Sequence, residues 1–137
     1  MGNRGKDDFG NNLEGSGDLS NIARVLKRTR DAIKSGDFYK LGHLSNATLH
    51  SATINQDSLN IVIAVLVYSI HKVMHRKHYS SLSGWDEFYD LLLKKLDLMI
   101  GSAEAGDSDG VFSAAGEVRQ SLNDIDGDLG NYIKDVF

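Results

Sequence analysis

The chain has 137 residues, the size of one compact domain, and contains no cysteine and no proline. Disulfides, thiolate metal sites and cysteine nucleophiles are therefore excluded, and the absence of the strongest helix breaker agrees with a largely helical chain. The formal charge of −4 is unevenly distributed, since residues 1–82 carry eleven Lys and Arg against seven Asp and Glu, whereas residues 83–137 carry four against twelve. We expect the two halves to neutralise each other within the fold.

The N-terminal segment, residues 1–17, is rich in Gly, Asn and Asp, and its sizeable apolar residues are Phe9 and Leu13. It cannot bury enough surface to offset its ordering entropy, so we expect a flexible tail ahead of a helical domain over residues 18–137. No secretory signal is visible, and the longest apolar run, Ile61–Tyr68, is much shorter than the roughly 20 residues of a membrane span. These features predict a soluble, cytoplasmic protein.

Two helices are predicted in the first part of the domain. The first begins at Asp18 or Ser20, either of which is a plausible N-cap, and ends at Gly36. Asp37 caps the second, which runs to about Thr53 and contains many small residues. Small side chains let a neighbouring backbone approach closely, so this helix is expected to pack tightly.

The third predicted helix starts after Asp57 and has the sequence SLNIVIAVLVYSIHKVMHRKH. Its first part has apolar residues on every side of the helix axis, which is typical of a helix in the middle of a bundle. The β-branched residues Ile61, Val62 and Ile63 are compatible with a strand, but roughly 20 residues without a breaker favour a helix.

Ser83 or Gly84 opens a fourth helix, and the segment GSAEAGDSDG at residues 101–110 is predicted to be a linker. The last helix repeats apolar residues at alternating spacings of four and three, a heptad pattern. Its stripe comprises Val111, Ala115, Val118, Leu122, Ile125, Leu129, Tyr132 and Val136. The fold class is therefore an all-α, single-domain helical bundle of about five helices, with the third helix buried at its centre.

The heptad stripe allows two interpretations. One is self-association with a second chain, through an interface formed by Val111, Val118, Leu122, Ile125, Leu129 and Tyr132. The other is packing against the chain's own bundle, for which the pattern gives equal support.

The segment HKVMHRKH places His71, His75 and His78 within about 60° of one another on a helix. Two histidines four residues apart can hold a metal ion with further ligands from elsewhere, so these three residues are a candidate metal site. Lys72, in the position that metalloproteases fill with Glu, and the other basic residues oppose a cation. We favour the basic end of a buried helix, where cations are stabilised by the helix dipole. Phosphate binding is the third option.

Two more histidines, His43 and His50, lie seven residues apart on the second helix. We expect them to donate hydrogen bonds across a helix interface.

Nucleic-acid binding is an alternative function for the basic first half of the chain. Its candidate residues are Arg24, Lys27, Arg28, Lys72, Arg76 and Lys77. The net acidic charge and the lack of interleaved aromatic residues in those segments weigh against it.

The segment SNATLHSATINQDSLNIVIAVLVYSIHKV, residues 45–73, resembles an uncharacterised archaeal all-helical protein family. The similarity is carried by the steps His50-Ser51-Ala52 and Gln56-Asp57, by Ala64–Ser69 with Lys72, and by the later Asn131-Tyr132-Ile133. The resemblance implies a helical fold and no particular activity.

No catalytic constellation and no cofactor-binding motif is found in the sequence. We therefore expect a non-enzymatic interaction or scaffold module that binds a protein partner or self-associates, without a cofactor, a membrane or a small-molecule substrate.

Overall fold

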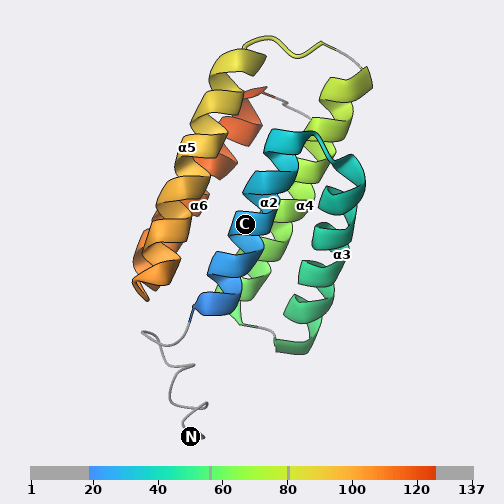
Figure 1. Cartoon of the computed structure of the whole chain (residues 1–137). Coiled ribbons are helices and arrows are strands. Elements are labelled where there is room, and N and C mark those ends of the chain that lie inside the picture. The colour runs from blue at the N-terminus through green and yellow to red at the C-terminus, as the bar shows by residue number, and fades with distance from the viewer. Residues whose placement is uncertain (1–18, 56, 80, 126–137) are drawn as a thin grey trace, which may run out of the picture.

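The computed structural model describes residues 19–55, 57–79 and 81–125, which form five helices. They are α2 (Ser20–Ser35), α3 (Phe38–Asn55), α4 (Ser58–Tyr79), α5 (Trp85–Glu104) and α6 (Ser108–Ile125). Consecutive helices run in opposite directions (Figure 1). The predicted all-α bundle is confirmed. The predicted tail, residues 1–17, lies outside the described residues.

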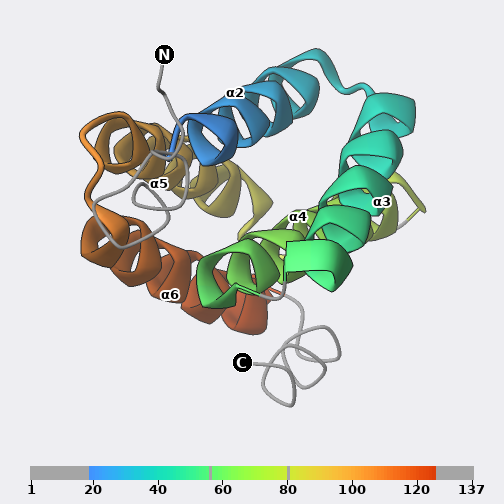
Figure 2. The same cartoon turned by 90° about the horizontal axis from the view of Figure 1, so that it is seen from below.

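The five helices form a ring in the order α2, α3, α4, α6, α5, as the view along the bundle shows (Figure 2). α4 packs against α3 and α6 and also reaches α2. It supplies four of the eleven largest fully buried side chains, namely Leu66, Val67, Ile70 and Val73. Its central role in the core is therefore as predicted. One side of α4 nevertheless faces outward, because Ile61 is 41% exposed and Lys72 and His75 are also exposed.

Two of the predicted N-caps are confirmed. The backbone N–H of Lys40 donates to the Asp37 carboxylate at 2.9 Å, and that of Asn60 donates to the Asp57 carboxylate at 3.2 Å. The prediction for Ser20 is wrong, because Ser20 is the first helical residue and Leu19 occupies the cap position without a side-chain hydrogen bond.

The connection between α5 and α6 is much shorter than predicted, since only residues 105–107 separate the two helices. Gly106 has a φ of +74°, and the N–H of Asp107 donates to the Ser102 carbonyl at 2.8 Å, so the chain turns within three residues. Asp107 then caps α6 by accepting a hydrogen bond from the Gly110 N–H at 3.0 Å. The linker prediction for residues 101–110 is therefore wrong, because the segment contains its own helix stop and start.

Four hydroxyl side chains are buried among the apolar residues of the core. Three of them donate to a carbonyl of the preceding helical turn: Thr29 to Val25, Thr48 to Leu44, and Ser69 to Val65, at 2.8–2.9 Å. These bonds satisfy the hydroxyls without help from a neighbouring helix. The fourth, Ser45, is 2% exposed, and its hydroxyl makes no hydrogen bond within the described part of the chain.

Among the described residues, one stretch, Ser58–His78 of α4, is long and apolar enough to cross a membrane, with a mean hydropathy of 1.4. Half of this stretch is buried inside the bundle. Length and composition alone do not separate a membrane span from the core helix of a bundle, since both pass the same test.

Candidate functional site

The three histidines of the HKVMHRKH segment lie in the last turns of α4, but they have different surroundings. His71 is half-buried, and a Cβ added at Gly42 of α3 would lie 3.6 Å from its Nε2 atom. His78 is exposed and its ring meets that of Phe38 edge-on, with centroids 5.2 Å apart. His75 is exposed, with its ring centroid 6.5 Å from that of His71. Because α3 packs against α4, the three histidines have different surroundings, although their spacing in the sequence places them on one side of the helix.

These histidines and the described residues around them do not form a metal centre. Within residues 19–55, 57–79 and 81–125, no three His, Asp or Glu side chains gather where they can hold one ion. Burial, followed by the neighbouring His75 and Lys72, lowers the pKa of His71. The positive charge of Lys72 also opposes an approaching cation. The metal site predicted at His71, His75 and His78 thus has no additional described ligand to complete it.

The basic residues around the histidines pack against aromatic rings. The Nζ atom of Lys72 lies 5.4 Å from the centroid of the Tyr68 ring, and that of Lys77 lies 5.5 Å from the Trp85 ring. Both distances are in the range of cation–π contacts. Arg76, Lys77 and His78 also fall in the last turn of α4, where the helix dipole favours positive charge. These contacts agree with the end-of-helix interpretation.

The prediction that His43 and His50 point into a helix interface is wrong, because both side chains are exposed on the outer side of α3. The ring of His43 meets that of Tyr39 edge-on, with centroids 4.5 Å apart. The buried side of α3 is formed instead by residues such as Leu41 and Leu44. The structure therefore places all five histidines of the chain on the α3–α4 pair.

This pair of helices contains no acidic residue, since Asp and Glu are absent from both α3 and α4. The nearest acids, Asp37 and Asp57, each hold an N-cap hydrogen bond at the start of a helix. The outward side of the pair, called the α3–α4 face below, is formed by exposed residues at helical spacing. Its members are Tyr39, His43, His50 and Ile54 on α3 and Ile61, Lys72 and His75 on α4. The face thus carries the positive charge of Lys72 and no acidic side chain.

Large apolar side chains are also exposed on this face. Tyr39 is 80% exposed, Ile54 is 67% exposed and Ile61 is 41% exposed. Leu49, which belongs to α3 but not to the face as defined, is 38% exposed. The α3–α4 pair therefore contains four of the seven large hydrophobic residues exposed in the described structure. Apolar side chains gathered on one surface are a feature of binding sites for other proteins.

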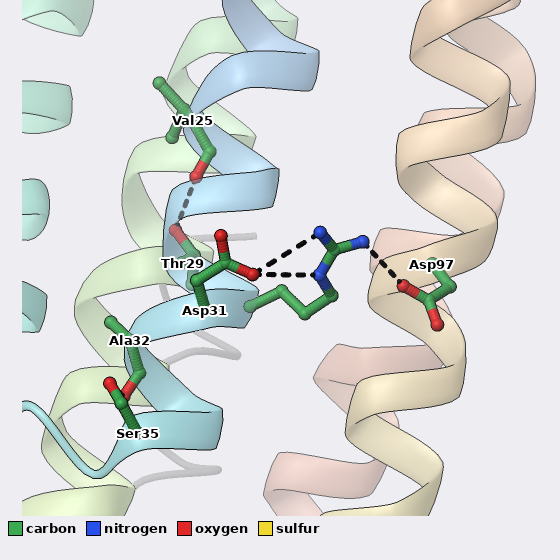
Figure 3. A network of polar contacts seen from close by, with 7 residues as sticks. Val25, Thr29, Asp31, Ala32, Ser35 and Asp97 are labelled. Atoms are coloured by element: carbon green, nitrogen blue, oxygen red, sulfur yellow. Dashed lines mark hydrogen bonds and ion pairs between the residues drawn. The ribbon is translucent and has the colours of Figure 1, made fainter.

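The basic residues of α2 do not join this face. Lys27 forms an ion pair with Glu104 at 2.5 Å, and Arg30 forms one with Asp97 at 3.1 Å, so both reach across to α5. The Arg30 guanidinium donates to Asp97 at 3.1 Å and to Asp31 at 3.4 Å, and both acceptors are labelled in Figure 3. The hydrogen bond to Asp97 is the main cause of the raised pKa of Arg30. These pairs link the basic and acidic halves of the chain, as the charge distribution predicts.

The nucleic-acid candidates are consequently divided between two surfaces. Arg24 and Arg28 are exposed on α2, where Arg24 donates to Asn21, whereas Lys72 and Arg76 are exposed on α4. α3 lies between α2 and α4 in the ring (Figure 2). The six predicted residues do not form one continuous basic patch.

The heptad stripe of α6 lies inside the bundle over the described part of the chain. Val111 and Leu122 are fully buried and Val118 is 1% exposed. Ile125 is partly buried and packs against the same core. Leu129 and Tyr132 lie outside the described residues. Of the two interpretations, packing against the chain's own bundle is the one that the described side chains adopt.

The chain shows no significant match to a family model, to a curated protein or to a solved structure. The resemblance of residues 45–73 to an archaeal helical family therefore stays a prediction.

The α3–α4 face is the candidate site that was not predicted from the sequence. Its signal was present in the sequence as the absence of Asp and Glu from residues 38–55 and 58–79.

Proposed function

We propose that this protein is a non-enzymatic helical interaction module that binds an acidic, partly apolar protein segment through the α3–α4 face. The observation that carries the proposal is the composition of that face, on which exposed apolar residues, Lys72 and the three histidines His43, His50 and His75 share two helices that lack any acidic residue. The apolar residues supply area for desolvation, and the charge selects an acidic partner.

The spacing of the exposed residues supports a helical partner. Tyr39, His43, His50 and Ile54 follow one line along α3, because their separations are four, seven and four residues. Ile61, Lys72 and His75 follow the neighbouring line along α4. Two adjacent parallel lines of side chains offer a surface on which an amphipathic helix can lie.

The α3–α4 face, and not the heptad stripe of α6, is the proposed binding surface. A side chain such as Leu122, which is fully buried against its own bundle, contributes to stability and reaches a partner only if α6 is pulled away. The exposed side chains Tyr39 and Ile54 need no such rearrangement.

The test uses a fluorescent acidic peptide of about 20 residues, long enough to form a bound helix, with Glu and Leu at helical spacing. The control peptide carries Lys in place of each Glu. We expect the acidic peptide alone to bind, and Ile54→Asp or Lys72→Glu to weaken binding at least about tenfold, as interface anchors do. Arg28→Glu, a matched charge reversal on α2, leaves binding unchanged. Equal binding of both peptides, or of neither, contradicts the proposal.

Nucleic acid is the alternative ligand, because Lys72 and Arg76 lie on an acid-free helix. A single-stranded RNA of mixed sequence, titrated at low salt, tests it. Tighter binding of the RNA than of the acidic peptide, with a steep dependence on salt, would favour the alternative.

A further inference from the structure

A second exposed surface has the opposite charge. The segment that contains α5 and α6, residues 85–125, carries nine acidic residues and three basic ones. Its outward side, called the α5–α6 face below, is formed by Glu87, Asp90, Leu91, Lys94, Leu98, Glu117 and Asp124, all of them exposed. Glu117 forms an ion pair with Lys95. With Lys94 and Lys95 counted, four acidic residues stand against two basic ones, so the face keeps a net negative charge. Leu98 is 53% exposed and Leu91 is 38% exposed, so this face also combines charge with apolar side chains.

The two faces point away from each other. In the ring of helices, α5 lies across from the α3–α4 pair (Figure 2). The side chains of Asp97 and Glu104 are turned toward α2 and are paired there, whereas Leu91 and Leu98 lie seven residues apart on the outward side of α5. One molecule therefore presents an acid-free face on one side and an acidic face on the other.

We propose that the acidic partner of the α3–α4 face is the α5–α6 face of a second copy of this chain. This inference rests on the proposed function and names its partner. Charge complementarity favours the pairing, because the α3–α4 face meets acids on the α5–α6 face, whereas two α3–α4 faces brought together carry the same sign of charge. Ile54 and Ile61 on one copy, and Leu91 and Leu98 on the other, provide the apolar contact.

The dimensions of the two faces are compatible. The exposed line on α3 from Tyr39 to Ile54 is about 24 Å long, and that on α5 from Glu87 to Leu98 is about 18 Å long, at 1.5 Å per residue. Each face comprises about seven exposed residues, fewer than the roughly 20–30 residues a side of a standard stable interface. The association is therefore expected to be weak and to require a high protein concentration.

The geometry of this pairing determines the type of assembly. Since each copy uses two different faces, a dimer keeps one free face of each kind and can add further copies. An assembly of this head-to-tail type grows with concentration. A symmetric dimer, in which one face pairs with itself, stops at two copies.

Sedimentation velocity of the full chain at low salt, from about 10 μM to 1 mM, tests the inference, with the affinity range set by the interface size. We expect the mass to rise beyond that of a dimer and to fall at high salt. Ile54→Asp places an acid on the α3–α4 face and Leu98→Lys places a base on the α5–α6 face, so each substitution removes both the apolar contact and the charge complementarity of one face, and each variant alone is a monomer. An equimolar mixture of the two forms a dimer and nothing larger, because one intact pair of faces remains.

A Leu98→Lys variant that still dimerises overturns the inference, as does a wild-type chain that stays monomeric at 1 mM. In either case, selective binding of the acidic peptide leaves the proposed function standing, so the two failures are distinguishable. Circular dichroism of both variants verifies that the helices are intact, and both substitutions lie at exposed positions where folding tolerates a charge.

Discussion

His71 of α4 lies directly against Gly42 of α3: a side-chain carbon at position 42 would sit 3.6 Å from the imidazole Nε2. The ring lies beside the α3 backbone and is half-buried, so α3 partly removes it from water. Burial then lowers the pKa of His71, with His75 and Lys72 adding to the effect. The packing of α3 on α4 therefore affects the pKa of His71.

The lowered pKa of His71 predicts that acidification destabilises the fold. A histidine with a lowered pKa stabilises the native state fully above its unfolded-state value of about 6.5, and this contribution is lost as the pH falls through the folded value. We expect urea denaturation to give a smaller free energy of unfolding at pH 5 than at pH 7.5. His71→Gln should reduce this difference, and His50→Gln, at an exposed position, should not. An unaltered pH dependence in His71→Gln would show that another group is responsible.

The surroundings of Gly110 and Gly116 in α6 predict different effects of the same substitution on stability. A Cβ at Gly110 would lie 2.5 Å from Oδ2 of Asp107 and 2.6 Å from Oγ of Ser102, whereas Gly116 has nothing within 4 Å. Gly116→Ala should raise the free energy of unfolding by about 0.5–1 kcal/mol through helix propensity. Gly110→Ala must displace the Asp107 cap, which is worth about 1 kcal/mol, so it gains no stability. Thermal and urea denaturation compare the two, and a Gly110→Ala protein as stable as Gly116→Ala contradicts the prediction.

Ser45 is a buried hydroxyl without a hydrogen bond to the described residues, whereas Ser69 donates to Val65 at 2.8 Å. An unsatisfied buried polar group costs about 1–3 kcal/mol. Ser45→Ala is therefore expected to stabilise the protein by about 1 kcal/mol. Ser69→Ala, at a site that is equally buried, should have a smaller effect or the opposite one. Loss of stability in Ser45→Ala would mean that the hydroxyl has a partner in solution.

The ion pairs between α2 and α5 are expected to contribute modestly. The Arg30 side chain is 25% exposed and bonds Asp97, whereas the Lys27 and Glu104 side chains are 45% and 52% exposed. Pairs of this kind contribute about 0.2–1 kcal/mol and are screened by salt. Arg30→Gln should therefore cost more than Lys27→Gln, and the difference should shrink at high salt. Equal costs at both salt concentrations would show that the losses are not electrostatic.

Local signals in the sequence predicted the helices well. Gly36, Asp37 and Asp57 act through bonds to their own neighbours in the chain, so their roles follow from residue type. The linker prediction for the segment from Ser102 to Gly110 was wrong because glycine and acidic residues are common both in a flexible linker and in a tight turn between two helices. The distinction depends on the left-handed φ of Gly106, which residue type alone does not settle.

The candidate site was less predictable, because it depends on which helices pack together. The pattern of Val111, Val118 and Leu122 specifies a buried stripe but does not specify whether the covering helix belongs to the same chain. Likewise, nothing in the spacing of His43 and His71 indicates that one lies on an exposed side and the other beside Gly42. Only the antiparallel packing of α3 on α4 gives these residues their positions.

The most direct test of the α3–α4 face is a ¹⁵N–¹H NMR titration of the labelled chain with the acidic Glu- and Leu-containing peptide. We expect the largest changes in amide chemical shift at residues 39–54 and 61–75, with little change around Val111, Val118 and Leu122. Changes centred on α6 or α2, with α3 and α4 unaffected, would contradict the assignment of the binding surface.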